Sequence, residues 1–117
     1  MKYFLDTYAL IEIIKGNSNY SKYIDQELST ALPDLYELFY ILLRDYNEQL
    51  AREYYYQFLD LVLPLKDVHI FTASRFKLTH KKSNISYVDS RGYAIAEQEG
   101  ISFLTGDTAF ENLPNVT

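Results

Sequence analysis

Tyr3-Phe4-Leu5-Asp6-Thr7 is a short apolar run that ends in an acid and a hydroxyl residue. Three apolar residues in a row suit a strand that is buried on both faces, as the strands of parallel sheets are. A second run of this kind, Ile101 to Leu104, precedes Thr105-Gly106-Asp107 near the other end of the chain. The sequence therefore predicts a sheet in which two buried strands each lead to a carboxylate.

Helical patterns fill the chain between these strands. Gly16 and Gly100 are typical of helix ends, Pro33 suits the first turn of a helix, and Pro64 suits the end of one. Ser29 to Leu32 is compatible with a brief strand. Helices are expected over residues 8–15, from 17 or 18 to about 27, and over 33–46, 48–63, 67–81 and 85–99. Short buried strands that alternate with helices indicate an α/β domain with a parallel sheet.

The composition is that of one globular domain spanning residues 1–117. Hydrophobic residues make up 48% and charged residues 23%, which argues against disorder. Without cysteine there is no disulfide framework and no thiolate metal site. A cytoplasmic protein is expected, because the first residues lack the apolar core of a signal peptide and no apolar run could span a bilayer. The net charge of −5 argues mildly against nucleic acid as a partner, but says little about local patches.

Asp6 and Asp107 are the candidate functional residues at the strand ends. Ligands of open α/β sheets bind beyond the carboxyl ends of the strands, and neighbouring strands lie only about 4.8 Å apart, so two such acids can share a metal site. Each acid also has a structural alternative, because aspartate is a favoured N-cap residue. Asp6 would then cap the helix that begins at Thr7, and Asp107 the short turn that follows it. Both alternatives stay open on the pattern alone.

Two further acids lie within predicted helices. Asp89 borders the apolar stripe of its helix, where a charge is costly unless it is paired or binds a metal. Its alternative role is in a capping pair with Ser86. Glu37 shares a narrow polar sector with Asp34 on an otherwise apolar helix, and periodicity alone favours a solvated acid there. Spacing does not separate Glu37 from Asp34.

In this order the acids resemble those of the PIN-domain ribonucleases, the family that includes the VapC-type toxins of toxin–antitoxin pairs. Residues 3–7 are similar to the family's first strand, and Leu35-Tyr36-Glu37-Leu38 resembles the helix that presents its glutamate, which selects Glu37 over Asp34. Ile85-Ser86-Tyr87-Val88-Asp89 resembles the helix with the third acid. Phe103-Leu104-Thr105-Gly106-Asp107, followed by Phe110, resembles the Thr-x-Asp at the last strand end. Ser90-Arg91-Gly92 departs from the family's usual small or aliphatic residues.

The resemblance implies a three-layer α/β/α fold, with a short central parallel sheet of four to five strands flanked by helices. It implies an endoribonuclease that hydrolyses RNA to leave a 5′-phosphate. The four catalytic carboxylates would be those of Asp6, Glu37, Asp89 and Asp107. An all-oxygen ligand set without Cys or His selects Mg²⁺ or Mn²⁺.

Each of the four acids has an expected role. The three aspartates are the expected metal ligands, and Glu37 would hold a water or a second ion. Thr7 and Thr105 are expected to orient the carboxylates. His69 and His80, which have no metal-binding partner in the sequence, are interpreted as surface or helix-packing residues.

Basic and aromatic residues suggest partners. The candidate RNA-binding residues are Arg75, Lys77, Lys81, Lys82 and Arg91. Cations near the end of a helix are also favourable without any ligand, so a solvated helix end is the alternative. Tyr54-Tyr55-Tyr56 cannot all face one core, so at least one tyrosine should be exposed. Such a surface suits a homodimer or an antitoxin-binding site.

Two other hypotheses compete with an active ribonuclease. One is a catalytically inactive PIN-like module that binds protein or RNA, since the presence of four acids does not measure turnover. The other is an aspartate-based phosphotransferase or a receiver domain. No second aspartate follows Asp6 by two positions, as phosphatases of that type need.

Overall fold

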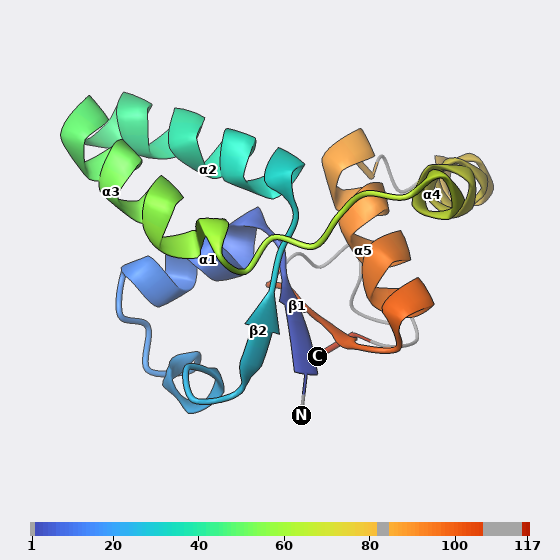
Figure 1. Ribbon diagram of the computed structural model, residues 1–117, viewed down its shortest axis with the longest axis horizontal. Coiled ribbons are helices and arrows are strands. Elements are labelled where there is room, and N and C mark those ends of the chain that lie inside the picture. Colours follow the sequence, from blue (N-terminus) through green and yellow to red (C-terminus); the bar gives the residue numbers. More distant parts are fainter. Residues whose placement is uncertain (1, 82–84, 107–115) are drawn as a thin grey trace.

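The computed structural model describes residues 2–81, 85–106 and 116–117. Two residues with predicted functions, Lys82 and Asp107, lie outside these ranges. In chain order the elements are β1 (Lys2–Leu5), α1 (Thr7–Ile14), the 3-10 helix η1 (Ser21–Tyr23), β2 (Glu27–Ser29), α2 (Leu32–Asp45), α3 (Glu48–Leu59), α4 (Asp67–Thr79), α5 (Tyr87–Glu99) and β3 (Ser102–Leu104) (Figure 1).

The described strands form one parallel sheet with the order β2-β1-β3. Phe4 in β1 pairs with β2 on one side and with β3 on the other. The family resemblance implied four to five strands. The described residues form these three, together with single parallel bridges between Thr30 and Val62 and between Phe103 and Val116.

Side chains of β1 alternate between the two faces of the sheet. Tyr3 and Leu5 belong to a buried cluster with α1, α2 and α3, whereas Phe4 belongs to a second cluster with α5 and β3. Figure 1 shows the same division, with α1, α2 and α3 on one side of the sheet and α5 and α4 on the other. The predicted three-layer α/β/α arrangement is confirmed, because a strand buried on both faces needs a helical layer on each.

Two helix predictions were wrong. The helix expected from 17 or 18 to about 27 is replaced by η1 and β2, because this part of the chain pairs with the edge of β1, where Leu28 lies opposite Tyr3. The helix expected over 48–63 ends at Leu59, several residues before Pro64. Pairing with Thr30 takes over from there, because the Thr30 amide donates to the Leu61 carbonyl at 2.9 Å.

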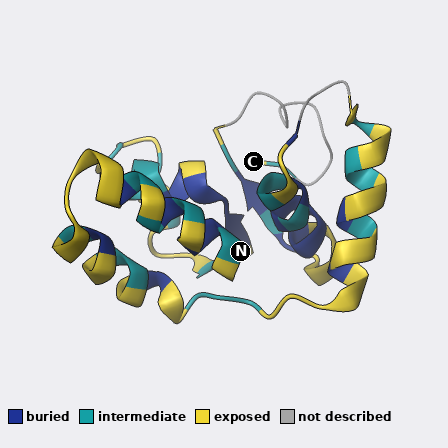
Figure 2. Ribbon diagram, turned by 90° about the horizontal axis from the view of Figure 1, so that it is seen from above, coloured by how far each residue is buried: buried dark blue, intermediate teal, exposed yellow. Residues whose placement is uncertain are grey.

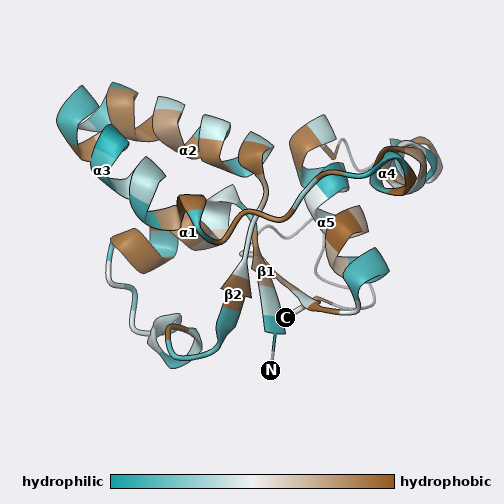
Figure 3. Ribbon diagram, in the orientation of Figure 1, coloured by the Kyte–Doolittle hydropathy of each residue, from teal (hydrophilic) through white to brown (hydrophobic). Residues whose placement is uncertain are grey.

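Helix α4 lies on the outside of α5 and is largely exposed (Figure 2), with hydrophobic residues distributed along it (Figure 3). His69 fixes it in place. Its side chain is 1% exposed, its Nδ1 accepts from the Lys66 amide at 3.0 Å, and its Nε2 lies 3.3 Å from Glu99 Oε1 on α5. The interpretation of His69 as a packing residue is confirmed. In the described ranges, no helix has the length and apolar character needed to cross a membrane.

The three consecutive tyrosines lie on α3. Tyr54 and Tyr55 pack partly buried against the first core cluster, whereas the Tyr56 side chain is 65% exposed. The prediction that at least one of them faces solvent is confirmed.

Gly92 lets α5 approach the sheet closely. A Cβ atom at this position would lie 2.9 Å from Cε1 of Phe4 and 3.3 Å from Cε1 of Phe103. Both rings are fully buried and stack on each other with their centroids 5.9 Å apart. The helix that carries Asp89 is therefore seated directly on the two strands that lead to Asp6 and Thr105.

Candidate active site

Asp6 is buried where β1 passes into α1. Its side chain is 2% exposed, and Oδ1 accepts from the Ala9 amide at 2.8 Å, which makes Asp6 the N-cap of α1. Its other oxygen, Oδ2, accepts a hydrogen bond from the Thr105 hydroxyl just beyond β3. The capping role anticipated for Asp6 is thus present, and the remaining oxygen is held by a residue from the neighbouring strand end.

Three of the four predicted acids line one pocket. The pocket has a volume of about 450 Å³ and lies at the carboxyl end of β1. It is lined by Asp6, Thr7, Tyr8, Ile11, Glu37, Ile41, Asp89 and Gly106. Residues far apart in the sequence therefore bring Asp6, Glu37 and Asp89 to a common cavity. Asp107 lies outside the described residues, but Gly106 immediately before it is part of the pocket wall.

Residues from the N-terminal parts of α1, α2 and α5 line this pocket. Asp6 caps α1, and Ser86 caps α5 by accepting from the Asp89 amide at 3.0 Å. Asp89 is the third residue of α5, as the capping alternative predicted. Helix N-termini carry a partial positive charge, which favours nearby carboxylates. Asp6 and Asp89 therefore lie where the helix termini offset part of the repulsion between the acids.

Asp34 is an acid that periodicity did not separate from Glu37. Its side chain is 1% exposed, and within residues 2–81, 85–106 and 116–117 neither carboxylate oxygen has a hydrogen-bond partner. Burial raises the pKa of Asp34 well above its usual range, and the charges of Asp6, Asp89 and Glu37 raise it further, while Arg91 lowers it. The family resemblance favoured Glu37, and the structure shows Asp34 buried beside the same acids.

The two threonines near the pocket make different contacts. The Thr105 hydroxyl donates to Asp6, which matches the positioning contact expected of it. The Thr7 hydroxyl instead donates to the backbone carbonyl of Asp34 at 3.3 Å. The Thr7 side chain therefore contacts the main chain in the first turn of α2. In this contact it does not orient a carboxylate, which was the role expected of it.

The described acids alone do not form a metal-binding group. Among residues 2–81, 85–106 and 116–117, no three His, Asp or Glu side chains are close enough together to hold a metal ion. The predicted four-carboxylate set includes Asp107, which falls outside these ranges.

A groove beside the pocket carries aromatic and basic side chains. It is lined by Pro33, Tyr36, Glu37, Tyr40, Val88 and Arg91. Tyr36 and Tyr40 are 78% and 56% exposed. Glu37 lines both this groove and the acidic pocket, so the two cavities adjoin. Arg91 also lines a second groove, between α4 and α5, which includes Lys77.

The other predicted RNA-binding residues are less well placed. Lys77 donates to the Ile85 carbonyl at 2.6 Å, and its ammonium lies 4.5 Å from the centre of the Tyr87 ring. Arg75 and Lys81 are exposed, but neither lines these two grooves.

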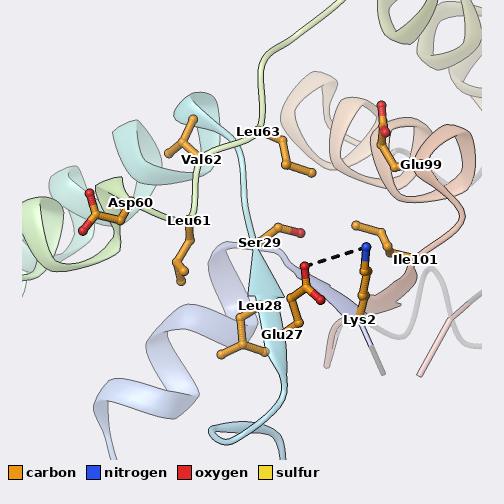
Figure 4. A pocket seen from close by; sticks show the side chains of 10 residues that line it. All are labelled: Lys2, Glu27, Leu28, Ser29, Asp60, Leu61, Val62, Leu63, Glu99 and Ile101. Carbon is orange, nitrogen blue, oxygen red and sulfur yellow. Dashed lines mark ion pairs between the residues drawn. The ribbon is translucent and has the colours of Figure 1, made fainter.

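A separate pocket of about 300 Å³ lies near the amino ends of the strands (Figure 4). Its acids do not converge, because Figure 4 shows Asp60 and Glu99 at opposite sides. Glu27 pairs with Lys2 at 3.7 Å, and Glu99 contacts Lys66 and His69. We therefore place the candidate active site at the carboxyl ends of the strands.

Solved structures share this fold. VapC20 of Mycobacterium tuberculosis, a toxin that cleaves the sarcin–ricin loop, is 18% identical with a TM-score of 0.78, over 97% of this chain and 96% of that one. DNA-bound VapBC from Salmonella typhimurium is 18% identical with a TM-score of 0.77, over 99% and 95%. A Klebsiella pneumoniae toxin–antitoxin complex is 15% identical with a TM-score of 0.76, over 98% and 95%. No curated protein sequence matches the chain.

The family of this chain follows from a match of its sequence to a family model. The PIN domain model matches residues 3–116, which is nearly the whole chain. This chain therefore belongs to the PIN-domain family, as the order of its acids predicted.

Proposed function

We propose that this chain is a Mg²⁺- or Mn²⁺-dependent endoribonuclease whose active site consists of Asp6, Glu37, Asp89 and Asp107. The observation that carries the proposal is the convergence of three of these acids, from three separate elements, on one pocket of a PIN-domain chain. A solvated acid or a simple helix cap explains each one singly, but not their common cavity.

The donor set fits a hard divalent cation. The pocket offers carboxylate oxygens, and the buried carboxylate of Asp34 has no hydrogen-bond partner in the described part of the chain. Carboxylates without Cys or His favour Mg²⁺ or Mn²⁺, and a cation relieves the repulsion among them. When bound, such a cation lowers the pKa of water and neutralises charge on a phosphodiester.

The chain's own residues hold the substrate and the acids in place. Thr105 and the Ala9 amide fix both oxygens of Asp6, which limits how far this carboxylate can turn. Glu37 and Asp89 approach from α2 and α5 and complete the walls of the cavity. The helix N-termini around the pocket favour a negatively charged phosphate.

Thermal melts and RNA cleavage assays together test whether the chain binds the cation and catalyses the reaction. Linkage predicts that Mn²⁺ at about 100 times its Kd adds about 2.7 kcal/mol of stability, which raises the Tm by on the order of 10 °C in a domain of this size. Cleavage of single-stranded RNA should depend on the same cation. Thermal melts with and without Mn²⁺, with Ca²⁺ and chelator as controls, check the first. A Tm that Mn²⁺ leaves unchanged, with no cation-dependent cleavage, contradicts the proposal.

Arg91 and the two exposed tyrosines support RNA as the substrate. Aromatic side chains stack on unpaired bases, and arginine contacts phosphate, so the groove beside the acidic pocket suits a single strand. Arg91→Ala should weaken RNA binding roughly threefold to tenfold and reduce the salt dependence of log Kd by about 0.7. Fluorescence anisotropy of labelled RNA, with a metal chelator present, measures both the affinity and its salt dependence.

Arg52→Ala is the control for Arg91→Ala. Arg52 is an exposed arginine on α3 that pairs with Glu48 at 3.2 Å and lines neither groove. RNA affinity that falls equally in the two variants would remove Arg91 from the binding surface.

We further propose that this ribonuclease is the toxin of a toxin–antitoxin pair. The support is the fold that it shares with the toxin–antitoxin complexes from Klebsiella pneumoniae and Salmonella typhimurium. A protein antitoxin and a second copy of this chain are then the expected partners, and the exposed Tyr56 on α3 suits either contact.

The second candidate function is a PIN-like binding module without turnover. The observation that favours it is the separation of the acids, since no three of them are close enough to hold a metal ion within the described residues. RNA binding without cation-dependent cleavage would support this alternative over the nuclease.

A further inference from the structure

Asp34 is fixed in place by its backbone. It lies in the first turn of α2, where its amide donates to the Ala31 carbonyl at 3.0 Å and its carbonyl accepts from the Thr7 hydroxyl at 3.3 Å. Thr7 is the first residue of α1 and follows Asp6 directly. The turn that carries Asp34 is therefore tied to the residue next to the most buried acid of the pocket.

The Asp34 carboxylate is buried and unpaired. Its side chain is 1% exposed, and neither oxygen has a hydrogen-bond partner among the residues that the structure describes. Buried polar groups in native proteins almost always have partners, so an unpaired one indicates that a water, an ion or a ligand belongs there. A buried carboxylate is especially costly to leave without compensation.

The charges around Asp34 are mostly of its own sign. The groups that act on it are Asp6, Asp89 and Glu37, and Arg91 is the cation among them. These interactions raise its pKa above the ordinary range, together with burial, which is the largest cause. One arginine does not balance four carboxylates, whereas a divalent cation would add two positive charges.

We propose that Asp34 is a further carboxylate of the cation site and contacts the divalent ion through one bridging water. This inference rests on the proposed function, because it assumes that the pocket binds a cation. This role accounts for a buried acid on α2 whose side chain has no hydrogen-bond partner among the described residues. The alternative is a buried carboxylic acid with a structural role only.

Direct binding of Mn²⁺ tests this role without any measurement of activity. Calorimetry or the electron paramagnetic resonance of free Mn²⁺ gives the Kd of the wild-type chain and of Asp34→Asn, which keeps the shape of the side chain and removes its charge. Mn²⁺ binding should weaken at least tenfold in Asp34→Asn. Asp34→Ala is the second variant, because alanine leaves no polar group unpaired in the core. Melts in chelator identify which variants are folded.

Asp67→Asn is the matched control, because Asp67 is also an acid in the first turn of a helix but is exposed on α4. Its Mn²⁺ affinity should equal that of the wild type. Equal affinities in the wild type, Asp67→Asn and the folded Asp34 variants would overturn the role of Asp34 and leave the nuclease proposal intact. A wild-type chain that does not bind Mn²⁺ would instead overturn the cation site as a whole.

Discussion

Asp6→Asn should lower the rate of cation-dependent RNA cleavage by roughly 100-fold or more. Loss of residues that only support metal ligands already costs about 10-fold to 100-fold, and Asp6 is proposed to be a ligand itself. Asparagine keeps the shape of the side chain but removes the negative charge that would attract the cation. Single-turnover cleavage of a labelled RNA at saturating Mn²⁺ measures this loss.

The same variant should fold as well as the wild type. Asparagine is as good an N-cap as aspartate, so its side-chain oxygen can still accept from the Ala9 amide, while its NH2 group in place of Oδ2 can donate to the Thr105 hydroxyl. Without cation, the variant should melt at the same temperature or higher, because one of several close negative charges is gone. Asp25→Asn, at an exposed acid, controls for the change in net charge. RNA cleavage at the wild-type rate by Asp6→Asn would remove Asp6 from the mechanism.

Gly92→Val should lower the free energy of unfolding by about 3 kcal/mol. Overpacking a core typically costs about 1–3 kcal/mol, and the upper end applies because the new atoms would meet two fully buried rings, those of Phe4 and Phe103. Neither ring can turn toward solvent to make room. Urea unfolding, followed by circular dichroism, measures the change.

Gln98→Val controls for the substitution of a β-branched residue in α5, since Gln98 is exposed on the same helix. Its unfolding free energy should change by less than about 1 kcal/mol. Gly92→Ala should fall between the two, because the better helix propensity of alanine partly offsets its contact with Phe4. Unfolding of Gly92→Val at the wild-type urea concentration would show that α5 can shift away from the sheet at little cost.

Local pattern predicted the parts of the fold that local forces determine. Three apolar residues before Asp6 indicated a strand buried on both faces, and Tyr3 and Phe4 do enter the two separate cores. Gly100 was expected to end a helix, and it does so in the left-handed conformation with φ of 69°. These features depend on a few neighbouring residues, so they can be predicted from the local sequence.

Contacts between distant residues were harder to foresee. The end of α3 at Leu59 depends on the pairing of Thr30 with Leu61, which lies 31 positions away and carries no local signal. The same holds for Asp34. Periodicity placed Asp34 and Glu37 in one polar sector, but Asp34 is buried because α2 begins against the other elements of the pocket.

The identity of the candidate site was predictable only in part. The strand-end position of Asp6 follows from its sequence context, whereas Glu37 was chosen over Asp34 by resemblance to the PIN-domain family. Glu37 lines one pocket with Asp6 and Asp89, and the charges of Asp6 and Asp89 raise the pKa of Asp34. The position of Asp107 stays a prediction.

The pairing at Thr30 has a consequence for how this domain can change. The chain leaves the sheet at Thr30 to form α2 and α3, and returns to the same residue through Leu61 and Leu63. The Thr30 hydroxyl also donates to the Leu5 carbonyl, one residue before Asp6, at 2.8 Å. The two helices thus form a hairpin closed at its base, with Glu37 near the closure and Tyr46 at the distant tip. Changes at that tip would therefore leave the spacing of the acids at the base unaltered.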